Sequence, residues 1–191
     1  MKNIKASTKL IYISTDGFAE GQGNYLEDTA LKHFSLSNPL SGYVNAKIDG
    51  ENWVKTHGNS IVIRTGPLYG KDIYGNWDKR IDNLISSLAQ NQTIFRSSNL
   101  YKTFVHVDDL ADLICEMTEK PYNGIIHAGP EMNESYYTFN MKIAKQLHLN
   151  EALILSEEID PVVAKSKGMP LDTSLNTEHC RKTFKTHFRN V

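Results

Sequence analysis

The chain has 191 residues, 40% hydrophobic and 23% charged, and its formal net charge at pH 7 is -1. This length and composition suit one globular domain with a sizeable core. The near-neutral charge argues against nucleic acid or an anionic membrane as a partner. Because the sequence shows neither a signal peptide nor a spanning segment, we expect a cytoplasmic protein.

The first predicted element is a buried parallel strand at residues 9–14. Its apolar run Leu10-Ile-Tyr-Ile13 ends in the small polar residues Ser14-Thr-Asp16. A buried parallel strand delivers such side chains to its carboxyl end. Thr15 is therefore a candidate ligand for a substrate oxygen.

A helix is predicted to begin near Ser41, a possible N-cap, and to end at His57-Gly58. Tyr43 and Lys47 lie in its first turns, four residues apart and thus on one face. The lysine charge stabilises the phenolate, which suits Tyr43 to exchange a proton with a carbonyl or alcohol. The same spacing also recurs on ordinary solvated helices.

Residues 60–65 read as a second buried strand, and strand, helix, strand in this order predicts a parallel α/β unit. Further on, apolar stripes predict three amphipathic helices near residues 81–88, 110–117 and 135–147, followed by an extended piece at 152–155 and a last helix near 176–184. Cys115 is expected to pack within a stripe, and Cys180, among charged residues, to be more exposed.

His106, Asp108 and Asp109 raise the question of a metal site. No third or fourth ligand cluster accompanies them, so we predict no bound metal. Asp108 or Asp109 is instead expected to cap a helix, with His106 partly buried. Lys71, Lys79 and Arg80 could meet a diphosphate, but a solvated loop and helix face is the preferred interpretation.

Five motifs occur in the order found in the extended short-chain dehydrogenase/reductases, and the chain most closely resembles the dTDP-4-dehydrorhamnose reductases of dTDP-rhamnose biosynthesis. These are Ile13-Ser-Thr-Asp16, Asn38-Pro-Leu-Ser-Gly-Tyr-Val-Asn-Ala-Lys47, Ile63-Arg-Thr-Gly-Pro-Leu-Tyr-Gly70, Phe104-Val-His-Val-Asp-Asp-Leu-Ala111 and Gly124-Ile-Ile-His-Ala-Gly-Pro-Glu131. By this resemblance the catalytic residues are Thr15, Tyr43 and Lys47.

The resemblance also implies residues that bind ligands. The candidate cofactor-binding residues are Tyr43, Lys47 and Ser14, and the candidate substrate-binding residues are Asp16, Arg64 and Lys102. Arg64 could equally be a structural ion-pair partner. Lys102 matches a basic residue that contacts the pyrophosphate in nucleotide-sugar epimerases and dehydratases.

Two positions depart from the reductases, because Gly17 and Pro67 stand where they have aromatic residues. A nucleotide-linked sugar is therefore better supported as substrate than any one sugar, and an epimerase or dehydratase is an alternative. A dinucleotide-binding fold also needs a glycine-rich turn after its first strand. The run Gly17 to Gly23 reads as a flexible active-site loop rather than such a turn.

Met1 resembles the end of the family's fourth helix. We therefore expect residues 1–191 to form a single domain: the carboxyl half of a doubly wound, Rossmann-like parallel sheet with a small α/β substrate-binding lobe. The core strands and catalytic helix would occupy about 1–70, with the lobe interleaved through about 71–191. NADP(H) or NAD(H) would then bind this chain weakly or not at all.

Three functions follow from the resemblance. The first is an NAD(P)-dependent nucleotide-sugar reductase completed by a cofactor-binding half, the second a non-catalytic regulatory or binding homologue, and the third a split-gene fragment. In every case the strand Leu10–Ile13 would lack a neighbour on one side. We expect a complementary N-terminal chain or a second copy of this chain to bind there.

Overall fold

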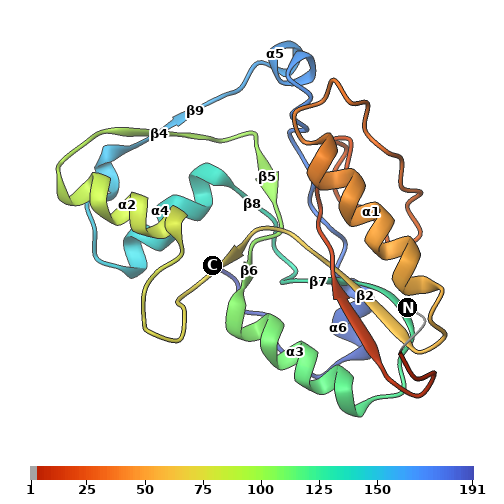
Figure 1. The fold of residues 1–191 in the computed structure, drawn as a ribbon. Coiled ribbons are helices and arrows are strands. Elements are labelled where there is room, and N and C mark those ends of the chain that lie inside the picture. Colours follow the sequence, from red (N-terminus) through yellow and green to blue (C-terminus); the bar gives the residue numbers. More distant parts are fainter. Residues whose placement is uncertain (1–3) are drawn as a thin grey trace.

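The computed structural model describes residues 4–191 (Figure 1). At its centre lies a parallel sheet in the order β1-β2-β7, formed by β1 (Leu10–Ile13), β2 (Ser60–Thr65) and β7 (Gly124–Ala128). Leu10 pairs with Ser60, and Ile61 pairs with Gly124. The predicted parallel α/β fold is confirmed, whereas the helix end placed at Met1 lies outside the described residues.

Helices cover both faces of this sheet (Figure 1). On one face, α1 (Ser41–Lys55) contributes Val44 and Ile48 to a core cluster that also contains Phe18. On the other face, α3 (Val107–Glu119) and α6 (Glu178–Thr183) pack against the strands. All six residues of β2 are buried, as expected for a central strand that is covered on two sides.

A smaller group of elements lies beside the sheet and is visible to the left in Figure 1. It consists of α2 (Lys79–Ala89), α4 (Tyr136–Gln146), β4 (Ile94–Ser97) and β9 (Ile154–Glu157), with β4 and β9 paired in parallel. The predicted apolar stripes of α2 and α4 form its core. The remaining elements are β3 (Leu68–Tyr69), β5 (Tyr101–Lys102), β6 (Val105–His106), β8 (Glu134–Ser135), the 3-10 helix η1 (Glu151–Leu153) and α5 (Pro161–Ser166).

Two predicted helix caps were wrong. Leu40 is the N-cap of α1 and makes no side-chain capping bond, so Ser41 is the first helical residue. His106 caps α3, because its Nδ1 accepts the backbone N–H of Asp108 at 3.2 Å. Asp109 is buried and instead binds Arg189 near the end of the chain.

The environments predicted for the two cysteines were also wrong. Cys115 is exposed, whereas Cys180 is buried against the sheet. The short helix α6 turns Cys180 inward and leaves its charged neighbours on the solvent side. Within residues 4–191, no helix has the length and apolar character needed to cross a membrane.

The strand β1 lies at the edge of the sheet, with β2 as its one strand partner among the described residues. The N–H of Leu10 donates to the carbonyl of Asn59, and the N–H of Ser14 donates to the carbonyl of Ile63. The amides at the even-numbered positions of this strand therefore face β2. The amides of Ile11 and Ile13 therefore face the open side. There the ammonium of Lys47 donates to the carbonyl oxygen of Ile13 at 3.0 Å.

Candidate active site

The three residues predicted to be catalytic line one cavity of about 400 Å³ at the carboxyl ends of β1 and β2. Thr15 follows β1, while Tyr43 and Lys47 come from the first two turns of α1. Thr65, Pro67 and Arg80 are also part of the lining. Of the predicted ligand-binding residues, Ser14 and Asp16 line the cavity as well.

Tyr43 and Lys47 lie on the accessible side of α1. The side chain of Tyr43 is 55% exposed. The ammonium of Lys47 lies 5.2 Å from the ring centroid of Tyr12 and is held by the carbonyl of Ile13. Tyr12 in turn packs against Gly50, where a Cβ would lie 2.2 Å from the tyrosine oxygen. Lys47 uses one N–H in this contact, which leaves two for a ligand.

The hydroxyl of Thr15 is oriented by the loop that follows it. Its oxygen accepts the N–H of Gly17 at 3.1 Å and lies 3.4 Å from a carboxylate oxygen of Asp16. A Cβ at Gly17 would lie 3.2 Å from Val44 and 3.3 Å from the Thr15 oxygen. An aromatic residue here would therefore crowd α1, so a glycine is the residue that fits at this position.

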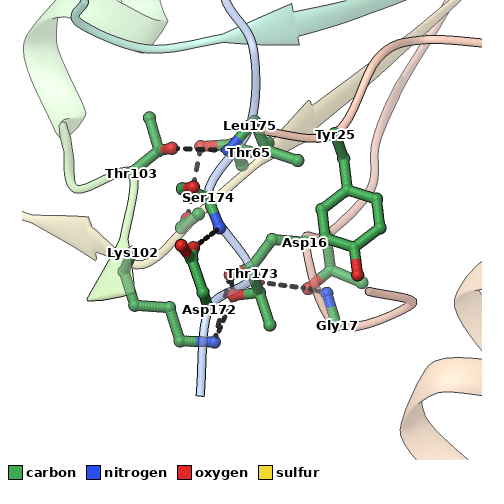
Figure 2. Close-up of polar contacts among 12 residues, drawn as sticks. Asp16, Gly17, Tyr25, Thr65, Lys102, Thr103, Asp172, Thr173, Ser174 and Leu175 are labelled. Atoms are coloured by element: carbon green, nitrogen blue, oxygen red, sulfur yellow. Dashed lines mark hydrogen bonds and ion pairs between the residues drawn. The ribbon is translucent and has the colours of Figure 1, made fainter. Parts of the chain in front are cut away.

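Asp16 and Lys102, two predicted substrate contacts, bind each other. The ammonium of Lys102 lies 3.2 Å from Asp16 Oδ2 and donates to the hydroxyl of Thr173 at 2.5 Å. Thr173 in turn donates to Asp16, and Figure 2 shows these three side chains together. Thr173 is fully buried, and nothing in the sequence indicated its role. This cluster joins the loop after β1 to β5 and to the chain near residue 173.

Arg64 is engaged inside the protein. Its Nη2 donates to Glu51 Oε2 at 2.8 Å and its Nη1 donates to the carbonyl of Glu27 at 3.2 Å. Both Arg64 and Glu51 are 1% exposed. The structure thus favours the ion-pair alternative for Arg64. No pattern in the sequence predicted a role for Glu51, although it lies one turn beyond Lys47 in the same helix.

Ser14 and His127 complete this buried polar cluster. The hydroxyl of Ser14 donates to Glu51 Oε1 at 2.6 Å, so it points into the core rather than to a cofactor. Burial and the nearby Arg64 charge lower the pKa of His127 to about 4, so its imidazole is neutral at pH 7. Among residues 4–191, no group of three histidine, cysteine or acidic side chains could hold a metal ion.

The loop from Gly17 to Gly23 does not fit the diphosphate of a dinucleotide. Gly23 has a φ of +74°, but a Cβ on it would lie 2.2 Å from Asp172 Oδ2. The space beside this glycine is therefore filled by a carboxylate, which would repel a phosphate. Phe18 and Ala19 in the same loop are buried. By contrast, Tyr43 and Lys47 offer accessible polar groups beside the cavity.

Cofactor binding by this chain alone should accordingly be weak. We expect titration of the isolated chain with NADPH or NADH to give no saturable heat in calorimetry, because no described glycine loop fits the diphosphate. Circular dichroism of the same sample would verify that the chain is folded. A low-micromolar affinity for either nucleotide would show that a diphosphate site exists elsewhere in the chain.

The parallel sheet with helices on both faces, and with Thr15, Tyr43 and Lys47 at one cavity, defines a Rossmann-like α/β protein. Its fold is similar to that of a hypothetical dTDP-4-dehydrorhamnose reductase from Sulfolobus tokodaii, with a TM-score of 0.74 and 24% identity. The chain belongs to the RmlD substrate binding domain family, whose profile matches residues 3–191.

Other solved structures share the fold. A dTDP-4-dehydrorhamnose reductase from Bacillus anthracis in complex with NADP has a TM-score of 0.73 and 22% identity over 92% of this chain. A dTDP-glucose 4,6-dehydratase from Streptomyces venezuelae with NAD bound has a TM-score of 0.66 and 17% identity over 96% of this chain. No curated protein sequence matches the chain.

The chain is shorter than these structural relatives. The match to the S. tokodaii protein covers 96% of this chain but 61% of that one. The corresponding shares of the B. anthracis reductase and the S. venezuelae dehydratase are 59% and 56%. The chain thus spans about three fifths of the length of the proteins that share its fold.

Proposed function

We propose that this chain supplies the proton donor and the substrate contacts of an NAD(P)-dependent nucleotide-sugar reductase of the dTDP-4-dehydrorhamnose type. The observation that carries the proposal is the meeting of Thr15, Tyr43 and Lys47 at one cavity. The family match supports the same class of substrate. A cavity of about 400 Å³ is within the size range of small-molecule sites.

Each of the three side chains has a distinct role in this proposal. Tyr43 donates a proton to the sugar oxygen that becomes a hydroxyl group, while the nicotinamide cofactor supplies the hydride. Thr15 orients the sugar oxygen with a hydrogen bond. Lys47 places a positive charge beside the phenol and offers its two remaining N–H groups to the cofactor ribose.

A cofactor-binding partner completes the reductase in this proposal. The relatives are longer than this chain, and β1 has an open side next to the residues that line the cavity. A parallel strand added along Leu10–Ile13 would satisfy the outward amides of β1. It would also bring a cofactor-binding segment to the side of the cavity that contains Lys47. A complementary N-terminal chain fits this position, and a second copy of this chain is the other candidate.

The open edge should govern self-association. Ile13 is 37% exposed, so Ile13→Lys places a charge on the edge without emptying the core. We expect wild type to dimerise or precipitate with rising concentration, and Ile13→Lys to be more monomeric, because edge lysines discourage strand pairing. Sedimentation velocity measures this. Leu36→Lys is the matched control, because Leu36 is 91% exposed and lies outside β1. A wild type that stays monomeric and soluble at high concentration would refute edge pairing.

A non-catalytic binding or regulatory protein is the second candidate. The observation that favours it is the internal pairing of predicted ligand-binding residues, since Arg64 is held by Glu51 and Lys102 by Asp16. These contacts leave fewer charged groups for a substrate than the resemblance implies. The exposed Tyr43 and Lys47 at the cavity weigh toward catalysis.

Complementation separates the two candidates. This chain would be co-expressed with the portion of the B. anthracis reductase that lies outside the matched region, and NADPH oxidation would be followed at a fixed concentration of a 4-keto nucleotide sugar. We expect oxidation that depends on both chains and on the sugar. A stable complex of the two chains that binds NADPH but oxidises none of it would refute the reductase proposal.

A further inference from the structure

Arg80 lines the same cavity as Tyr43 and Thr15, although the sequence favoured a solvated helix face for it. It lies in the first turn of α2, where Asp78 anchors it from two directions. Asp78 Oδ1 accepts the backbone N–H of Arg80 at 3.0 Å and its side-chain Nε–H at 3.3 Å. The guanidinium also donates through Nη2 to the carbonyl of Leu68. These contacts fix the guanidinium and leave several N–H groups free for a ligand.

The charges around the cavity do not balance. Its lining contains two cationic side chains, Lys47 and Arg80, and one carboxylate, Asp16. That carboxylate is paired with the ammonium of Lys102 at 3.2 Å, and Arg80 is paired with Asp78 at 3.3 Å. With both counterions counted, the cavity keeps one positive charge in excess, that of Lys47, which favours a ligand with an anionic group.

We propose that Arg80 binds the sugar-linked phosphate of a nucleotide sugar whose sugar ring lies at Tyr43. This assignment rests on the proposed function. One hexose ring separates the reacting carbon of such a ligand from its phosphate, and a cavity of about 400 Å³ has room for both. A guanidinium with a fixed orientation can offer two parallel N–H groups to phosphate oxygens. Lys102, which the resemblance assigned to the pyrophosphate, is instead occupied by Asp16 and Thr173.

The test measures binding of dTDP-glucose to the wild-type chain and its variants by calorimetry. Arg80→Ala should weaken the affinity at least about tenfold, as expected for the loss of charge-assisted hydrogen bonds. Arg80→Lys should recover part of it, since the charge remains and the fork is lost. Lys79→Ala is the matched control, because Lys79 is the neighbouring exposed cation and does not line the cavity. Circular dichroism and thermal unfolding would establish that each variant is folded.

The source of the phosphate is tested in two parallel titrations: the chain is titrated with inorganic pyrophosphate, and its complex with the complementary chain is titrated with NADPH. A loss confined to dTDP-glucose and pyrophosphate supports the assignment, whereas a loss confined to NADPH overturns it by placing Arg80 at the cofactor. Equal losses in Arg80→Ala and Lys79→Ala also overturn it, because they reveal a general charge effect. Undiminished dTDP-glucose binding in Arg80→Ala overturns this inference and leaves the reductase proposal standing. Arg80-dependent binding in a chain that fails complementation supports the phosphate site and refutes the reductase.

Discussion

Replacing Tyr43 with phenylalanine should lower turnover of a 4-keto nucleotide sugar by about a hundredfold or more in the complemented enzyme. The change removes the proposed proton donor and keeps the aromatic ring. Because Tyr43 is 55% exposed, the loss of its hydroxyl leaves the core of the protein unchanged. Turnover would be measured as NADPH oxidation under saturating sugar, together with the binding affinity for the sugar nucleotide.

Two further variants make this result specific. Thr15→Val should have a smaller effect on turnover, since it removes one hydrogen bond rather than the proton source. Tyr74→Phe should have none, because Tyr74 is 83% exposed and does not line the cavity. Near-normal turnover in Tyr43→Phe would eliminate Tyr43 as the proton donor.

The largest stability effect is expected at Glu51. Glu51→Ala would leave the guanidinium of Arg64 buried without its carboxylate, and breaking a buried ion pair costs roughly 3–5 kcal/mol. The hydroxyl of Ser14 would lose its acceptor as well. Urea unfolding measures the change in free energy. Glu178→Ala is the control, because its ion pair with Lys182 lies at the surface, and little change is expected there.

The pH dependence of stability should change in the same variant. Burial raises the pKa of Glu51, but hydrogen bonds from Arg64 and Ser14 outweigh it and hold the pKa below the ordinary value of 4.5. A depressed folded-state pKa stabilises the protein above that ordinary value and loses this contribution as the pH falls below it. Glu51→Ala should therefore flatten the acid side of the stability profile. A loss of less than about 1 kcal/mol at pH 7 would mean that Arg64 finds other partners.

The sequence predicted the longer helices and the strands β1 and β2 because their signals are local. The stripe that contains Leu84 and Leu88 repeats at helical spacing, and the run at 60–65 is apolar enough to mark a central strand. The meeting of Thr15 with Tyr43 also follows from local order, because a parallel strand and the helix after it share one end of the sheet. The positions of Thr15 and Tyr43 were predictable because each is set by the strand or helix that contains the residue or precedes it.

The partners of the charged residues could not be predicted, because they depend on distant segments. Lys102 pairs with Asp16, which is 86 positions away in the chain, and this contact changes a predicted substrate ligand into a partner within the protein. Arg80 changes in the opposite direction, from a residue without a predicted role to a candidate ligand-binding residue. Its sequence context is that of a solvated helix, but the fold places it at the cavity. The predicted N-cap of α3 was wrong because the imidazole of His106, rather than the carboxylate of Asp108 or Asp109, accepts the free backbone N–H at the start of the helix.

The bond between Asp16 and Thr173 has a consequence for synthesis of the protein, because the two residues are 157 positions apart. Thr173 leaves the ribosome after every strand of the central sheet, so the sheet can form before this bond does. The loop that orients Thr15 therefore gains this support only after 157 further residues have been synthesised. A chain that folds in this order forms its sheet early and fixes the arrangement around Thr15 late.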